Sequence, residues 1–274
     1  MQPPTLGIDL GGTKLLMVAA DQESRVVTGP HFTPQQLHQH LVEFMTHHGI
    51  ERANIGIAVP GLVDASQRLV ACDVLPHFTG WRPQTELAAV AQQVTVLNDV
   101  KAALGEEFHD APASLTAVMI MVGTAIGAGI LADGRPLRGC SGWAGELGYI
   151  PVLDADGQLR RLDERAGGAA ITTYCNMPAD ELARLAQAGD ARVLASIADA
   201  GQAFGLGLAT VINLINPSVI ALGGGTLALP GYLDAALASA QKASITTLWQ
   251  ACEIRMVRTG HKVVALGAAR AASV

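Results

Sequence analysis

Residues 5–20 read TLGIDLGGTKLLMVAA, an apolar run that stops at two glycines and then resumes. The two apolar runs predict two strands, and Gly11 and Gly12 predict the tight turn between them. A glycine turn after a strand exposes backbone N–H groups that can hold phosphate oxygens, although a single turn of this kind more often only joins two strands. Asp9 ends the first strand, where its carboxylate would repel a phosphate unless Mg²⁺ lay between them; the alternative is an Asp that caps the turn.

The same order of elements returns later in the chain. Residues 115–122 predict a strand, residues 123–129 a glycine-rich turn and residues 130–132 a returning strand. A third glycine cluster, at residues 223–225, follows the buried strand predicted at 218–222. Further strands are predicted at 25–27, 55–59, 94–97 and 253–257, and helices at 34–48, 100–109, 192–215, 231–247 and 264–272. The sequence therefore predicts two similar α/β halves, and three glycine turns at matching points favour phosphate contacts more than one turn alone.

The two halves are expected to join near residues 110–114, where Pro112 lies among small residues. We predict an N-terminal lobe over residues 1–110 and a larger C-terminal lobe over residues 111–261. The last helix, within residues 262–274, is expected to pack back on the first lobe.

Composition and charge exclude several classes of protein. The chain has 274 residues, with 18 Lys and Arg against 24 Asp and Glu, and its net charge of −6 leaves no electrostatic footprint for nucleic acid. Residues 200–233 carry no charge, but Asn, Pro and Gly interrupt them, so no membrane span is expected. The N-terminus lacks the pattern of a signal peptide, and the four cysteines lie far apart without a CxxC pair. These features predict a cytoplasmic protein with reduced thiols.

Asn98 and Asp99 follow a buried strand and begin a predicted helix. Side chains at this place face a cleft in many α/β sheets, and a carboxylate there can take the proton of an attacking alcohol. The alternative is that the two residues only cap the helix.

A series of motifs in this order resembles the ROK family of repressors and sugar kinases over essentially the whole chain. They are DLGGTK (9–14), PG (60–61), ND (98–99), GTAIGAG (123–129), AGELG (144–148) and NP leading to GGG (216–225). The resemblance implies an α/β, two-lobed hexokinase/actin-like fold of duplicated ribonuclease H-like halves with an interlobe cleft. It also implies a homodimeric sugar kinase that uses ATP and Mg²⁺ to phosphorylate the 6-hydroxyl of a hexose or N-acetylhexosamine, as glucokinases and kinases of N-acetylmannosamine or N-acetylglucosamine do.

The resemblance assigns a role to each motif residue. Asp99 matches the catalytic base. Asp9, because of its place beside the first glycine turn, is expected to hold Mg²⁺ through water. The positions expected to bind the sugar are Gly61, Asn98, Asp99, Glu146, Tyr149 and Asp163. The positions expected to bind ATP and its phosphates are Asp9, Gly11, Gly12, Thr13, Lys14, Gly123, Thr124, Gly127, Gly223, Gly224 and Gly225.

The chain departs from the family's pattern at two places. The family usually has a His that contacts the sugar and binds zinc, and this chain has Tyr149 at that position. Residues 151–165 also lack the family's cysteine cluster. No zinc site is therefore expected. Tyr149 either donates its hydroxyl to the sugar or fills the space of the metal site. Asp163 lies where a sugar-binding Glu is usual, so it either reaches the sugar differently or the pocket takes another substrate. Which sugar is used stays open.

The alternative function is a sugar-binding regulator, or a kinase that has lost activity. The family's repressors carry an N-terminal helix-turn-helix, whereas the first strand here is predicted to begin near Thr5, which favours the kinase. The intact motifs around Asp9 and Asp99 favour it as well.

Overall fold

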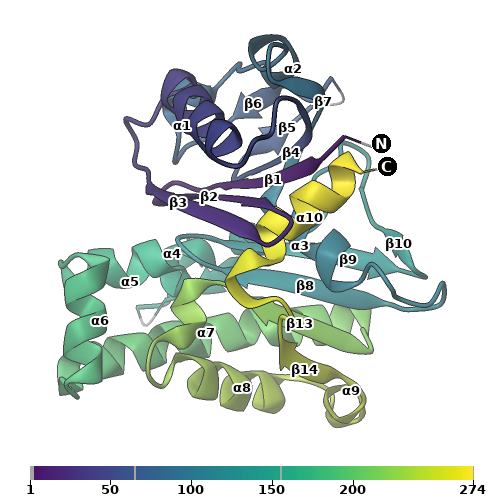
Figure 1. Cartoon of the computed structure of the whole chain (residues 1–274). Helices are drawn as coiled ribbons and strands as arrows, with labels where there is room; N and C mark the ends of the chain where they lie inside the picture. Colours follow the sequence, from purple (N-terminus) through teal and green to yellow (C-terminus); the bar gives the residue numbers. More distant parts are fainter. Residues whose placement is uncertain (1–2, 65, 155, 274) are drawn as a thin grey trace. The chain divides into compact units, whose positions relative to one another are not determined.

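A computed structural model of the chain describes residues 3–64, 66–154 and 156–273. The chain divides into two compact units, Met1–Asp110 with Arg258–Val274, and Ala111–Val257. Each unit contains one five-stranded sheet (Figure 1). The second unit is continuous in sequence, whereas the first is completed by the last segment of the chain.

The sheet of the first unit has the strand order β3-β2-β1-β4-β7. These strands are β1 (Thr5–Leu10), β2 (Lys14–Ala19), β3 (Gln22–Val27), β4 (Ala53–Val59) and β7 (Ala91–Asn98). The first three strands are antiparallel, while β4 and β7 run parallel to β1. The helices are α1 (Pro34–His47), α2 (Pro83–Glu86), α3 (Asp99–Glu107) and α10 (Val263–Ala272), and a short hairpin pairs β5 (Leu62–Val63) with β6 (Leu69–Ala71).

Helix α1 covers one face of this sheet. It begins with a capping box, in which the Thr33 hydroxyl accepts from the Gln36 backbone and the Gln36 side chain accepts from the Thr33 backbone. Its apolar residues recur at helical spacing, and Leu37 and Leu41 are fully buried in the same core cluster as Ile8 of β1.

Helix α10 covers the opposite face of the sheet at very close range. A Cβ added at Gly7 would collide with the backbone carbonyl of Ala265 on α10, and a Cβ added at Gly56 would collide with that of Ala268. Figure 1 shows α10 beside β1 and α3. Because side chains alternate along a strand, Asp9 lies on the same face as Gly7, two residues before it.

The sheet of the second unit repeats this arrangement in the order β10-β9-β8-β13-β14. These strands are β8 (Ala117–Val122), β9 (Ile126–Ala132), β10 (Arg135–Pro136), β13 (Val219–Gly223) and β14 (Glu253–Met256). Again three antiparallel strands are followed by two parallel ones, so the chain has the predicted duplicated α/β fold. The remaining elements are β11 (Pro151–Leu153), β12 (Leu159–Arg161), α4 (Asp163–Ala166), α5 (Gly168–Cys175), α6 (Ala179–Gln187), α7 (Ala191–Ile215), α8 (Tyr232–Ala243) and α9 (Thr246–Ala251).

Helix α7 is the central helix of the second unit. Its Phe204 and Leu208 are fully buried in the core of that unit. Among the described residues it is the one helix long and apolar enough to cross a membrane by length and composition, and 61% of its most apolar window is buried inside the fold. A core helix of a globular unit has these same properties, so the helix is weak evidence for a membrane span.

The glycine-rich turn predicted over residues 123–129 is wrong in extent. Strand β9 already begins at Ile126, and Gly127 and Gly129 pair with Met121 and Met119 of β8. The turn itself is therefore limited to residues 123–125.

The single helix predicted over residues 231–247 is also wrong, because the structure has two helices there. The Asn213 side chain on α7 donates to the carbonyl of Ala243 and accepts from the N–H of Ile245. These two bonds satisfy backbone groups at the break, so α8 ends and α9 starts again at Thr246.

The second unit ends at Val257, four residues before the end of the lobe expected from the sequence. Arg258 belongs to the first unit because its side chain pairs with Glu107 and Asp110.

Candidate functional site

Three strands of the first unit end at one edge of its sheet and bring together most of the site residues predicted there. Strands β1, β4 and β7 are parallel neighbours, so their carboxyl ends share an edge. The register pairs Asp9 with Ala58, and Val59 with Asn98. The glycine turn after β1, Gly61 after β4 and Asp99 after β7 therefore lie at this edge.

The β1–β2 turn is held by backbone bonds and by one side chain. The N–H of Gly11 donates to the carbonyl of Lys14 at 2.9 Å, and the Thr28 hydroxyl donates to the carbonyl of Gly11 at 2.6 Å. A Cβ at Gly12 would lie 2.9 Å from the Cβ of Val74, so a side chain does not fit there. Thr13 and Lys14 are exposed at the tip.

Asp9 is a buried carboxylate beside this turn, with only 9% of the residue exposed. Burial raises its pKa from 3.8 to about 6, and the positive charge of Lys14 opposes that shift. A divalent cation would favour the ionised form in the same way as Lys14 does. Mg²⁺ is commonly held by one or two carboxylates while it keeps several waters, so a lone carboxylate of this kind fits that ion.

Asn98 and Asp99 form the start of α3, and Asn98 is its N-cap as the sequence suggested. The Asn98 side chain accepts from the N–H of Val100 at 3.1 Å and donates to the carbonyl of Gly61 at 3.5 Å. Asp99 accepts from the same Val100 N–H at 2.8 Å. Each side chain is thus oriented by the backbone of the helix start.

Cys72 is a residue at this edge that sequence reasoning missed. Its thiol donates to the carbonyl of Pro60 at 3.3 Å, next to the Gly61 carbonyl that accepts from Asn98. The thiol is buried, and burial raises its pKa. No signal in the sequence links Cys72 to residues 60–61, because the contact depends on the β5–β6 hairpin bringing them together.

In the second unit the β8–β9 turn is bound from two sides. The carbonyl of Gly123 accepts from the Thr226 hydroxyl at 2.9 Å and from the N–H of Gly168 at 2.8 Å. The carbonyl of Thr124 accepts from the N–H of Ala169 at 3.1 Å. Thr226 was not predicted, although its place directly after the glycines at 223–225 is a usable signal.

Gly223 is the last residue of β13, the parallel neighbour of β8, and Gly224 and Gly225 follow the strand. Gly224 has φ +107°, and a Cβ there would collide with the backbone of Val122 at the end of β8. The structure therefore brings Gly123, Thr124 and this glycine cluster together at one edge of the second sheet. Gly127 lies inside β9 rather than in the turn.

Glu146 directly precedes the 3₁₀ turn Leu147–Tyr149, and Tyr149 is its last residue. This turn is fixed because Gly145, with φ +103°, presses against the backbone of Ala128 in β9. Both side chains are exposed, and the Arg161 guanidinium lies 4.9 Å from the centre of the Tyr149 ring.

Asp163, the first residue of α4, already accepts a hydrogen bond from the backbone. Its Oδ1 accepts from the N–H of Ile126 at 2.6 Å. Burial raises its pKa, while the Ile126 N–H and the charge of Arg161 oppose that shift.

No group of three His, Cys, Asp or Glu side chains within the described ranges is placed to hold a metal ion. The expected absence of zinc stays a prediction.

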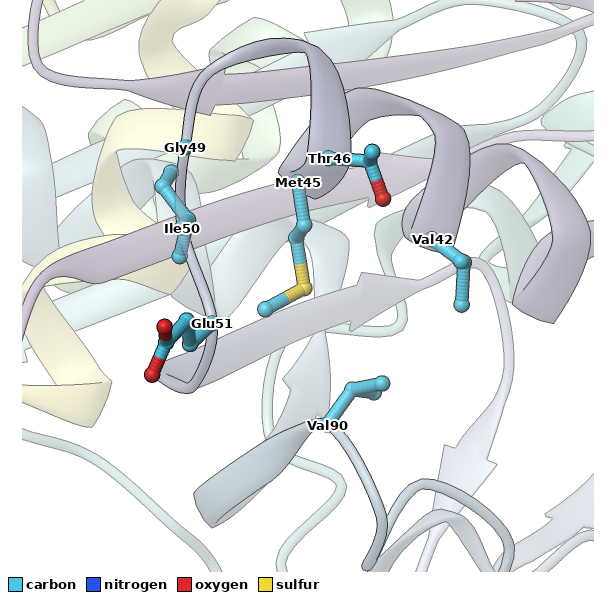
Figure 2. Close-up of a pocket in the computed structure, with 7 residues that line it drawn as sticks. All are labelled: Val42, Met45, Thr46, Gly49, Ile50, Glu51 and Val90. Atoms are coloured by element: carbon cyan, nitrogen blue, oxygen red, sulfur yellow. The ribbon is translucent and has the colours of Figure 1, made fainter.

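A hollow of about 450 Å³ in the first unit is separate from all these residues. It is lined by Val42, Met45, Thr46, Gly49, Ile50, Glu51 and Val90 (Figure 2). Its walls are mainly apolar and none of the residues predicted for catalysis or phosphate contacts faces it, so the chemistry is not placed there.

Comparisons with known proteins agree on one family. The ROK family model matches residues 5–273. An N-acetylmannosamine kinase of Citrobacter koseri is 30% identical over 72% of this chain and 70% of that kinase. The xylose repressor of Bacillus spizizenii is 26% identical over 80% of this chain and 63% of the repressor.

Solved structures give the same result for the fold. A ROK hexokinase from Thermus thermophilus is 28% identical, with a TM-score of 0.75 and 98% of both chains covered. A ROK family glucokinase from Streptomyces griseus, in complex with glucose and AMPPNP, is 23% identical, with a TM-score of 0.78 over 97% of this chain and 98% of that chain.

Proposed function

The chain belongs to the ROK family, and on that basis we propose that it is a sugar kinase that transfers a phosphoryl group from ATP, with Mg²⁺, to the 6-hydroxyl of a hexose or N-acetylhexosamine. One observation carries the proposal: Asp9, the glycine turn and the Asn98–Asp99 pair lie at the same edge of one sheet. The similar kinase from Citrobacter koseri supports a carbohydrate substrate. The AMPPNP complex of the similar glucokinase supports ATP as the donor.

Asp99 is the proposed base that takes the proton of the sugar hydroxyl as it attacks phosphorus. It lies in the first turn of α3, where the helix dipole favours the charged carboxylate. Asn98 and Gly61 are proposed to bind the sugar beside it, and the bond between them fixes their relative position. Glu146 is proposed to accept from sugar hydroxyls, and Tyr149 to donate to the sugar.

Glycine turns and neighbouring residues are proposed to bind the phosphates of ATP. In the first unit these are Gly11, Gly12 and Thr13, with the exposed cation of Lys14. In the second unit the proposed contacts are Gly123, Thr124, Gly224 and Gly225, together with Gly127 in β9 and Gly223 at the end of β13. Asp9 would hold Mg²⁺ through water, and the bound cation supplies neutralisation of phosphate charge.

Asp99→Asn tests the proposal directly. We expect kcat to fall by at least ~10²-fold, the size of a lost general base, while sugar-induced thermal stabilisation is kept. The measurement is ADP release with MgATP and a panel of hexoses, N-acetylhexosamines and β-glucosides. Asp21→Asn, an exposed carboxylate of the same unit, is the matched control and should keep full turnover. Turnover of Asp99→Asn near the wild-type rate would remove Asp99 from the mechanism.

The second candidate is a catalytically weak or inactive sugar-binding regulator. The similarity to the xylose repressor favours it. The same panel separates the two functions, because a sugar that stabilises the protein thermally without any ADP release supports the regulator.

We also propose that the protein is a homodimer in the cytoplasm. It is proposed to bind neither zinc nor nucleic acid nor a membrane. The net charge of −6 supports the absence of nucleic-acid binding, and Tyr149 in place of the zinc-binding His supports the absence of zinc. Stoichiometric zinc in EDTA-washed protein would contradict the proposed absence of zinc.

A further inference from the structure

Asp163 is bonded to the residue that follows the β8–β9 turn. Its Oδ1 accepts from the N–H of Ile126 at 2.6 Å, and Ile126 is the first residue of β9, directly after Gly123, Thr124 and Ala125. A hydrogen bond from an amide to a carboxylate is among the stronger ones in proteins. Asp163 therefore fixes the point at which the chain leaves the turn.

The same carboxylate also packs against the segment that carries Glu146. A Cβ added at Gly148 would collide with the carboxyl carbon and both carboxyl oxygens of Asp163. Gly148 lies in the 3₁₀ turn that begins directly after Glu146. One side chain thus touches both the β8–β9 turn and the segment of the proposed sugar ligand.

The backbone after Asp163 holds the other side of the β8–β9 turn. The carbonyl of Asp163 accepts from the N–H of Gly167 at 3.1 Å, and the next N–H, of Gly168, donates to the carbonyl of Gly123 at 2.8 Å. Displacement of Asp163 would therefore act on the turn both through Ile126 and through the start of α5.

We infer that Asp163 is a positioning residue for the β8–β9 turn, through the N–H of Ile126. This inference rests on the proposed function, because it assumes that the turn holds ATP phosphates. The Asp163 Oδ1 accepts from Ile126 and the carboxylate lies against Gly148, so removal of the side chain should loosen the turn and weaken nucleotide binding more than sugar binding.

Steady-state kinetics of Asp163→Ala and Asp163→Asn test the inference. For Asp163→Ala we expect the KM for MgATP to rise about 10-fold, as for a lost hydrogen bond to a charged group, and the KM for the sugar to change less than about 2-fold. Asp163→Asn keeps an oxygen that can accept from Ile126, so its KM for MgATP should lie between those of the wild type and Asp163→Ala. Asp180→Asn, an exposed carboxylate on α6, is the control. A raised KM for the sugar with an unchanged KM for MgATP would overturn the inference.

A second readout needs no turnover. In ¹⁵N NMR spectra the Ile126 amide should exchange at least about 10-fold faster in Asp163→Ala than in Asp180→Asn, with a smaller increase in Asp163→Asn. Titration with Mg²⁺ and AMPPNP should show weaker binding by both Asp163 variants than by Asp180→Asn. If Ile126 exchange is unchanged, the inference fails even where the sugar kinase is confirmed. If the wild-type protein phosphorylates no sugar, but the Asp163 variants show faster Ile126 exchange and weaker binding of AMPPNP, the proposed function fails while the positioning role stands. Asp163→Asn also serves where Asp163→Ala does not fold.

Discussion

At the scale of one residue, the buried carboxylate of Asp9 lowers the stability of the folded protein at neutral pH. Its pKa is about 6 in the folded protein, against 3.8 in a solvated carboxyl, chiefly because of burial. Because the pKa of Asp9 is higher in the folded than in the unfolded protein, protonation of its carboxyl favours folding. The stabilising contribution of Asp9 to the free energy of unfolding is therefore fully present below about pH 4 and is lost as the pH rises through about 6. At neutral pH the ionised carboxylate therefore opposes folding.

We expect Asp9→Asn to be more stable than the wild type at pH 7.5 by about 2–3 kcal/mol, the free energy of a shift of about two pKa units. The gain should vanish at pH 3.5, and the variant should lose kinase activity because the carboxylate for Mg²⁺ is gone. Urea unfolding at both pH values measures the difference. Asp21→Asn, which changes an exposed carboxylate, should show no such pH dependence. A destabilised Asp9→Asn at pH 7.5 would mean that burial does not dominate its pKa.

Helix α10 shows at the scale of an element how Asp99, the proposed base, is held in place. A Cβ at Gly267 would collide with the backbone carbonyl of Ala102 on α3, the helix that begins with Asp99. Gly267→Ala should therefore destabilise the protein by about 1–3 kcal/mol, as overpacking does, and should lower kcat because α3 shifts.

The matched control is Gly105→Ala on α3 itself, where an added Cβ meets no atom within 4 Å. That change should be neutral or stabilise by up to about 1 kcal/mol, because alanine is the better helix former. Thermal unfolding and kcat of both variants give the comparison. Equal behaviour of the two variants would show that the close contact between α10 and α3 does not position Asp99.

The elements differ in how far the sequence predicts them. Strands β1 and β2 are predicted well because each is an apolar run and the two adjacent glycines between them favour a turn. Strand β9 is missed at its start because Gly127 resembles a turn residue, and only pairing with Met121 makes it part of a strand. The bond from Ile126 to Asp163 spans 37 residues and has no local signal at all.

At the scale of the whole molecule, Arg258 joins the two chain segments of the first unit. Its guanidinium pairs with Asp110 at 2.9 and 3.1 Å and with Glu107 at 3.2 Å, and the Glu107 side chain is fully buried. The duplicated fold is predictable from the repeated motifs, but this contact joins residues about 150 positions apart. The exact end of the second unit therefore cannot be predicted from the sequence.

We expect Arg258→Met to destabilise the protein by about 2–4 kcal/mol, because it leaves the buried Glu107 carboxylate without its cation. The bond from Arg258 also lowers the pKa of Asp110 to about 2. A lowered carboxyl pKa stabilises the folded state above about pH 4, and this contribution is lost as the pH falls toward 2. Chemical unfolding between pH 2 and 7 measures both effects. Arg192→Met, an exposed residue of α7, is the control, and a similar loss in both variants would contradict the role of Arg258.

The order of the units along the chain has a consequence for synthesis. Residues 263–272 leave the ribosome after the entire second unit, yet they cover the face of the sheet that contains Gly7 and Gly56. At the usual rate of translation that face stays uncovered for on the order of ten seconds. The second unit can complete its fold during translation, whereas the first can do so only after α10 has emerged. A nascent chain stalled before residue 258 should accordingly bind chaperones through its earliest strands.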